Sequence, residues 1–315
     1  MNNNSKVWLA MAIFLGIIVI LSIFMILFMP RGRFYIGGGD ANLRHSVNIK
    51  IHEKTQIDLT AYSERIFYLK NDSDELIIKE YYRSKTKKAD INVSEQAVRI
   101  RCDQDVNLLV FGNIHDRIEI YLPQNYRGNL SASVSSGDIR SELHFTAERL
   151  SFEANSGALS LGHLNADSIH LRASSGSIRV AGINGEATVK ANSGSISIDR
   201  LTGFADVDAS SGSIRVNDIT GGITAKANSG TIRIGILELS GDVNAAVSSG
   251  SINIDLPTDS GFKFSANTSS GSIRTDFDSS LSFNERRNNA SGTVGDNASY
   301  TVTAKANSGS IRVGR

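Results

Sequence analysis

The stretch Ala191-Asn192-Ser193-Gly194-Ser195-Ile196-Ser197-Ile198 decides the fold, because close copies of it recur through the C-terminal part of the chain. A Ser-Gly pair marks each copy, with its glycine at Gly137, Gly157, Gly176, Gly194, Gly212, Gly230, Gly250, Gly271, Gly292 and Gly309. The spacings between these glycines are 20, 19, 18, 18, 18, 20, 21, 21 and 17 residues. A period near twenty indicates an array of repeats, each of which buries its apolar face only against its neighbours.

Each repeat contains two short runs in which apolar and polar residues alternate. One run follows the Ser-Gly pair, as in Ser177 to Val180, and the second follows a turn, as in Val207 to Ala209. Alternation sends successive side chains to opposite faces, which is typical of a half-buried β-strand. Glycine and asparagine tolerate positive φ, so the Asn/Ser-Ser-Gly triplet suits a tight corner between strands.

Two architectures fit this pattern. In a β-helix, equivalent strands stack in parallel about 4.8 Å apart; in a meander, Ser-Gly is a hairpin turn and the strands are antiparallel. The column of Asn or Ser beside the corner favours coils, because stacked small polar side chains can hydrogen-bond along the axis. Ile196, Leu201 and Val207 miss the six-residue spacing of the left-handed hexapeptide helix. We therefore predict an all-β, β-helix-like solenoid, right-handed or irregular, of about ten repeats of 17–21 residues.

Composition excludes several functional classes. The 33 basic and 32 acidic residues leave a net charge of +1, which argues against a nucleic-acid binder that relies on bulk positive charge. The single cysteine, Cys102, forbids an intrachain disulfide and a cysteine metal cluster, and we expect it to be a small core or edge residue. Gly37-Gly38-Gly39 is not a phosphate loop, because no Lys-Ser/Thr follows it. No cofactor is expected.

The N-terminus predicts a single-pass membrane anchor. Residues 7–29 contain no charge and are long enough to span a bilayer as a helix, after a short head at residues 1–6. The run is too long for a signal peptide and lacks a small-residue cleavage site. Arg31 and Arg33 beyond the span favour a cytoplasmic C-terminal part, whereas a very short head favours export of the C-terminal part. We expect an anchor in the cytoplasmic membrane with the repeats on the extracytoplasmic side.

Three further segments come after the anchor. Residues 30–46 are a predicted juxtamembrane linker, residues 47–130 an irregular β region that caps the array, and residues 131–315 the repeat array itself. One phrase occurs twice: Leu122-Pro123, followed by Ser136-Gly137, resembles Leu256-Pro257, followed by Ser270-Gly271.

A strand-rich leading region, a Leu-Pro phrase and Ser-Gly-Ser-Ile-x-Val repeats together resemble the bacterial β-strand-repeat family named putative adhesins. The resemblance covers roughly residues 45–315. It implies an all-β, β-helix-like domain, often tethered to a membrane and facing outward. It transfers no catalytic residues to this chain.

Catalysis and metal binding have little support. Asp199, Asp218, Asp255 and Asp276 follow the first strand of their repeats, and aspartate beside a turn commonly satisfies backbone N–H groups. His144 and His163 lie one repeat apart and could stack, but two ligands without carboxylate partners make a weak metal site. We expect no enzyme, although a β-helix acting on polysaccharides stays an alternative.

Arginine recurs three residues after the corner glycine, in what we call the arginine stripe: Arg140, Arg179, Arg215, Arg233, Arg274 and Arg312. These side chains alternate with aliphatic ones, so they point outward and form a line if the coils are parallel. One interpretation is a solubilising row paired with acids such as Asp138 and Glu142. The other is a binding row for an anionic surface glycan, since arginine's forked donors suit carboxylate or phosphate.

The chain ends at Val313-Gly314-Arg315, directly after a repeat strand. An open end would expose unpaired backbone groups, so we expect that self-association through this end is available to the protein. The leading functional hypothesis is adhesion or glycan binding at the cell envelope. The second is a scaffold or regulatory partner in envelope-stress signalling.

Overall fold

The computed structural model describes residues 41–102 and 116–315. They form twenty-one β-strands and one short 3₁₀ turn, η1 (Asp278–Ser280), so the all-β prediction is confirmed. Among these residues no helix is long and apolar enough to cross a membrane. The predicted head, the membrane helix at 7–29 and most of the linker lie outside the described residues and stay predictions.

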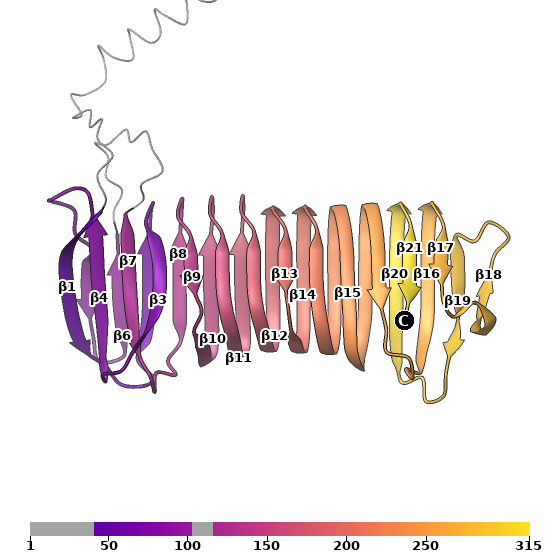
Figure 1. Ribbon diagram of the computed structural model, residues 1–315, viewed down its shortest axis with the longest axis horizontal. Coiled ribbons are helices and arrows are strands. Elements are labelled where there is room, and N and C mark those ends of the chain that lie inside the picture. The colour runs from indigo at the N-terminus through magenta and orange to yellow at the C-terminus, as the bar shows by residue number, and fades with distance from the viewer. Residues whose placement is uncertain (1–40, 103–115) are drawn as a thin grey trace, which may run out of the picture. The chain divides into compact units, whose positions relative to one another are not determined.

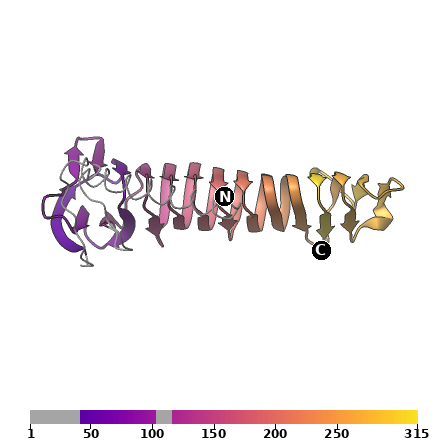
Figure 2. The same ribbon diagram turned by 90° about the horizontal axis from the view of Figure 1, so that it is seen from above.

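The middle of this unit is a row of stacked coils (Figure 1). Its strands are β8 (Leu130–Val134), β9 (Ile139–Ser141), β10 (His144–Ala154), β11 (Leu159–Ala173), β12 (Ile178–Ser193), β13 (Ile196–Ile198), β14 (Leu201–Ser211) and β15 (Ile214–Asp255). Equivalent positions of successive repeats pair in parallel: Ile178 with Ile196, and Ile196 with Ile214. These repeats are therefore not an antiparallel meander. Figure 2 shows the same row from above.

The core of each coil is a thin layer of aliphatic side chains. Ile178, Ile196 and Ile214 are at most 1% exposed, and each lies over its equivalent in the next coil. Burying such a side chain contributes about 1.5–3 kcal/mol, and stacking shares this gain along the row. Near the corners the core narrows to alanine, as at Ala191 and Ala209, which pair with each other.

The corner glycines form a column in which backbones approach closely. A Cβ added to Gly212 or Gly230 would overlap the carbonyl oxygen of the glycine one coil earlier, Gly194 or Gly212 respectively. Gly230 also has a φ of 138°, which residues with a side chain rarely adopt. Packing therefore explains why glycine recurs at this corner without any functional demand.

The N-terminal coils do not stack in chain order. Their strands are β1 (Asn42–Lys50), β2 (Gln56–Ala61), β3 (Arg65–Asn71), β4 (Glu75–Tyr82), β5 (Asp90–Val93), β6 (Ala97–Arg101) and β7 (Arg117–Pro123). The β2–β3 coil pairs in parallel with β8 and β9 on one side and with β6 and β7 on the other. β1, β4 and β5 add antiparallel pairings at this end. After the β2–β3 coil the chain thus runs toward the N-terminal end of the row as β4 and β5 and forms the β6–β7 coil there. It then crosses over the β2–β3 coil to reach β8.

The C-terminal end is interleaved as well. Its strands are β16 (Phe262–Ser270), β17 (Ile273–Thr275), β18 (Leu281–Phe283), β19 (Asn289–Val294), β20 (Tyr300–Ser308) and β21 (Ile311–Gly314). The last two lie between β15 on one side and β16 and β17 on the other, so the C-terminus lies inside the row (Figure 1).

Two expectations are corrected here. The last strand is not an open end, because both of its edges are paired; beyond it, antiparallel β18 and β19 follow β16. The expectation of an open, unpaired strand at the C-terminus is therefore wrong. Gly292 is also not a corner, since it lies within β19 opposite Phe264 of β16.

The two Leu-Pro phrases mark the two crossovers that skip a coil. Leu122-Pro123 ends β7 before the crossing to β8, and Leu256-Pro257 follows β15 before the crossing to β16. Both leucines are 4% exposed. Each proline carbonyl then accepts a turn hydrogen bond, from the N–H of Tyr126 at 3.1 Å and of Ser260 at 3.3 Å. The similar phrases thus occupy the same place in the topology.

Candidate binding surface

All six stripe arginines share one register position along the row. Across the middle coils the Cα partners at this position are Arg140, Ser160, Arg179, Ser197 and Arg215. Arg233 follows one coil later, because its corner glycine Gly230 packs on Gly212. At the far end Asn253 pairs with Arg312, and Arg312 pairs with Arg274. The stripe covers eight inter-coil steps, about 38 Å at the usual strand spacing.

Because the C-terminal coils are interleaved, stripe residues that are far apart in the sequence become direct neighbours. Arg274 and Arg312 are 38 residues apart in the chain, yet they are direct Cα partners because β21 pairs with β17. Two guanidinium groups therefore project from adjacent strands. Like charges in this arrangement destabilise the sheet slightly unless an anion offsets them.

The stripe arginines are exposed, and one of them is paired. Arg140 Nη2 lies 2.9 Å from Asp138 Oδ2. Burial alone would raise the pKa of Asp138, but the Ala158 N–H bond and the Arg140 and Arg65 guanidiniums outweigh it and lower the pKa. The other five have no carboxylate within 4.0 Å among the described residues. Pairing with acids therefore accounts for Arg140 only.

The rows beside the stripe differ in chemistry. Two residues before the arginines, the chain has hydroxyl side chains at Ser177, Ser213, Thr231, Ser272 and Ser310. Two residues after them, acids occur at Glu142 and Asp276, whereas Asp199 and Asp255 follow the uncharged stripe positions Ser197 and Asn253. Four arginines consequently have no acid at either flanking position of their own strand: Arg179, Arg215, Arg233 and Arg312.

The aspartates considered as catalytic acids fall into two places. Asp199, Asp218 and Asp255 line one open depression of about 520 Å³ together with the exposed Leu237. Asp276 lies elsewhere, and its Oδ2 accepts the backbone N–H of Arg315 at 3.2 Å. It therefore helps to hold the final strand against β17. Within 41–102 and 116–315 no group of three metal-ligating side chains occurs.

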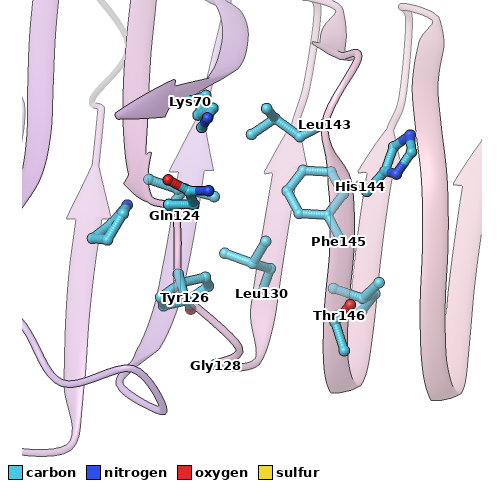
Figure 3. A pocket seen from close by; sticks show the side chains of 12 residues that line it. Lys70, Gln124, Tyr126, Gly128, Leu130, Leu143, His144, Phe145 and Thr146 are labelled. Carbon is cyan, nitrogen blue, oxygen red and sulfur yellow. The ribbon is translucent and has the colours of Figure 1, made fainter. Parts of the chain in front are cut away.

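His144 and His163 stack as the repeat spacing indicated. They are Cα partners of β10 and β11, and their ring centroids lie 4.5 Å apart at 70°. His144 also borders a hollow of about 380 Å³ beneath the first Leu-Pro crossover (Figure 3). Tyr126, Leu130 and Phe145 give the hollow an apolar lining, and the hydroxyl of Tyr126 is occupied in a bond to the Thr55 carbonyl at 2.8 Å. The hollow was not predicted from the sequence, since only the crossover creates it.

A buried group of charges at the N-terminal end was also not predicted from the sequence. We call it the cap charge group: Glu64, Arg83, Lys87 and Asp116. Lys87 Nζ lies 2.6 Å from Glu64 Oε1 and 3.1 Å from Asp116 Oδ2. Arg83 donates to Asp116 Oδ1 through its backbone N–H at 3.2 Å and its Nε at 3.4 Å. Burial alone would lower the pKa of Lys87, but Glu64 and Asp116 outweigh it and raise the pKa.

Glu64 ends the corner column. A Cβ on Gly137 would overlap the Glu64 carbonyl, so Glu64 occupies the position that glycine has in the following coils. Cys102 lies nearby as a buried free thiol, as expected, and its sulfur accepts the Tyr82 hydroxyl at 3.9 Å. Burial raises the pKa of the Cys102 thiol, which makes it a poor nucleophile.

Comparison with family models matches residues 46–314 to the family described as Toastrack DUF4097. The chain belongs to this family. The Toastrack match spans the stacked coils, both crossovers and nearly all of the capping strands, so the whole described unit is one family domain. No curated protein sequence matches the chain.

Solved structures similar to this Toastrack domain include three proteins with adhesion-related descriptions. A "putative adhesin" from Bacteroides fragilis has 14% identity and a TM-score of 0.40, covering 85% of this chain and 96% of its own. One from Parabacteroides merdae has 10% identity and a TM-score of 0.34, covering 89% and 98%. A "putative cell adhesion protein" from Clostridium sporogenes has 12% identity and a TM-score of 0.23, covering 86% and 98%. At these TM-scores the likeness carries no weight for function.

Proposed function

We propose that this protein is a non-catalytic envelope protein whose array, a β-solenoid, binds an anionic glycan along the arginine stripe. In this proposal residues 7–29 anchor it in the cytoplasmic membrane and the array lies on the extracytoplasmic side. The observation that carries the proposal is the set of four exposed arginines without a flanking acid, Arg179, Arg215, Arg233 and Arg312. Their donors stay available to the carboxylate or phosphate groups of a ligand.

Binding would be weak at each coil and additive along the row. An exposed ion pair contributes about 0–1 kcal/mol, but a polymer held at one coil is already close to the next arginine. The neighbouring Ser and Thr hydroxyls add donors and acceptors for sugar hydroxyls. Retention should therefore need several arginines at once and should weaken with added salt.

Replacing Arg179, Arg215 and Arg233 together by Ser tests the proposal. At about 0.5 kcal/mol for each lost contact, affinity for polygalacturonate at low salt should fall about tenfold. The matched control removes three cations from another row, Arg172→Ser, Lys190→Ser and Lys226→Ser. That row contains acids, since Glu153 pairs with Arg172 and Asp208 with Lys190 and Lys226.

A loss specific to the stripe variant supports the proposal. Equal losses in both variants would show that binding depends only on net charge. Unchanged retention of the stripe variant would refute a glycan site and favour a scaffolding role.

Membrane sidedness needs its own test: protease added to intact spheroplasts should digest the array. Protection until the membrane is broken would place the array in the cytoplasm and contradict the envelope role.

A further inference from the structure

The cap charge group brings an amine and a carboxyl group together in a largely buried site. Lys87 lies in the loop between β4 and β5, and Asp116 directly precedes β7. The side chains of Lys87 and Asp116 are 9% and 8% exposed, and that of Glu64 is fully buried. The Tyr82 ring centroid lies 5.1 Å from Lys87 Nζ and adds an aromatic wall.

The contacts divide the four residues into distinct chemical roles. Lys87 supplies the only amine among them. Glu64 Oε2 accepts the N–H groups of Tyr62 and Ser63 at 2.9 Å each, which fix the orientation of this side chain. Its Oε1 lies 2.6 Å from Lys87 Nζ, which is close enough to take a proton from the ammonium group.

Asp116 differs from Glu64 because a second cation contacts it. Both Arg83 donors converge on Oδ1, whereas Lys87 approaches Oδ2. Donors aimed at one carboxyl oxygen stabilise the negative charge that develops there when a nucleophile adds to the carbon. The arrangement is that of an acyl-transfer site with Asp116 as the acyl group.

We infer that Lys87 and Asp116 join in an intramolecular isopeptide bond, with Glu64 as the proton carrier and Arg83 as the oxyanion donor. This inference is independent of the proposed glycan binding. Glu64 first takes a proton from the Lys87 ammonium and passes it to Asp116 Oδ2. The neutral amine then adds its lone pair to Cγ, while one electron pair of the carbonyl moves to Oδ1 beside Arg83.

Collapse of this intermediate completes a balanced reaction. Glu64 removes a second proton from nitrogen and delivers it to the hydroxyl at Oδ2, the Cγ–Oδ2 bond breaks, and one water leaves. The net change is ammonium plus carboxylate to amide plus water, with Glu64 regenerated and no oxidant or co-reactant needed. Fixed proximity in such pairs corresponds to effective concentrations of about 10⁵–10⁸ M, which offsets the usual preference for hydrolysis in water.

The bond would close the N-terminal end covalently. Lys87 belongs to the loop of the antiparallel cap, whereas Asp116 leads into the β6–β7 coil, so the link ties the cap to that coil. A cross-link between two segments limits how far an end can fray. Repeat arrays lose structure most easily at their ends, where a coil has one neighbour.

Mass spectrometry of the purified full-length chain tests this directly. The expected result is an intact mass lower by one water, and a tryptic product in which Thr86–Lys88 is joined to Cys102–Arg117, because trypsin does not cleave after an acylated lysine. Lys87→Arg should abolish the product, and the neighbouring Lys88→Arg should keep the link.

Unmodified peptides carrying free Lys87 and Asp116 would overturn the inference and leave a plain buried ion pair. A link from Lys87 to the Thr55–Arg65 peptide would instead identify Glu64 as the acyl group and overturn the assignment of Asp116. Glu64→Gln should yield a folded, unlinked chain; a fully linked variant would refute the role of Glu64 as proton carrier. The wild-type measurement does not depend on whether any variant folds.

Discussion

The two ends of the array share a topology but differ in the chemistry that closes them. At each end one coil is stacked between two others, so that the stacking order differs from the chain order. Antiparallel strands then complete the sheet. The C-terminal closure is aromatic: Phe262 and Phe277 are at most 4% exposed, with ring centroids 5.3 Å apart. At the N-terminal end the closure contains the cap charge group. Apolar contacts tolerate substitution by other apolar groups, whereas a buried charge needs its partner.

Lys87→Met should have the largest effect of the substitutions that test this difference. It removes the amine that contacts Glu64 and Asp116, and with it the inferred link; Glu64 and Asp116 then stay buried without that cation. Removing one partner of a buried pair costs about 3–5 kcal/mol. Native-state hydrogen exchange should show the amides of β4 and β7 exchanging roughly 100- to 4,000-fold faster.

Two controls sharpen this prediction. At the aromatic end, Phe264→Met keeps an apolar side chain in the core and should cost about 1.5 kcal/mol or less. Lys88→Met, at an exposed lysine beside Lys87, should change stability by about 0.5 kcal/mol at most. Equal sensitivity of the two ends would contradict a difference in closing chemistry.

Gly230→Ala should have an intermediate effect, since it probes the middle coils rather than an end. The added Cβ would meet the Gly212 carbonyl oxygen, and the φ of 138° is strained for alanine. A loss of about 1–3 kcal/mol is expected, measured as a lower urea midpoint. In Gly235→Ala the nearest atom to the new Cβ is Asn217 Cα at 3.7 Å, an ordinary contact. The same loss in both variants would show that the corner column is not the constraint.

The arginine stripe variant should have the smallest effect on stability. Arg179, Arg215 and Arg233 are exposed and have no carboxylate within 4.0 Å in the described part of the chain. Surface substitutions of this kind usually change stability by about 0.5 kcal/mol or less, so the urea midpoint should match that of the unmodified chain. A large drop would assign the stripe a structural role and weaken the binding interpretation.

Much of the middle of the molecule could be predicted from local sequence. The Ser-Gly period and the alternation of Ile196 and Ile198 with serines are local properties, and the parallel register follows from stacking equal units. His144 beside His163 and a common line for the arginines follow from the same period.

The ends could not be predicted in this way. Glu64, Lys87 and Asp116 are separated by 23 and 29 residues, and no motif relates them. Glu64 occupies a corner position that is glycine in later coils, so sequence alignment of the repeats offers no reason to expect an acid there. The repeated Leu-Pro phrase marks both crossovers. The sequence does not show, however, that another coil lies between the strands that each crossover connects.

The sequence by itself determined the all-β class, the size of one coil and the outward position of the arginines, because these depend on period and alternation within a repeat. Only the tertiary structure decided the stacking order, the closed position of the last strand, the pairing of Arg274 with Arg312 and the meeting of Lys87 with Asp116. Similar repeats present similar edges, so local pattern cannot rank one stacking order above another. The stacking order depends on how each end coil packs against its neighbours and on the antiparallel strands that cover it, and these contacts exist only in the folded chain.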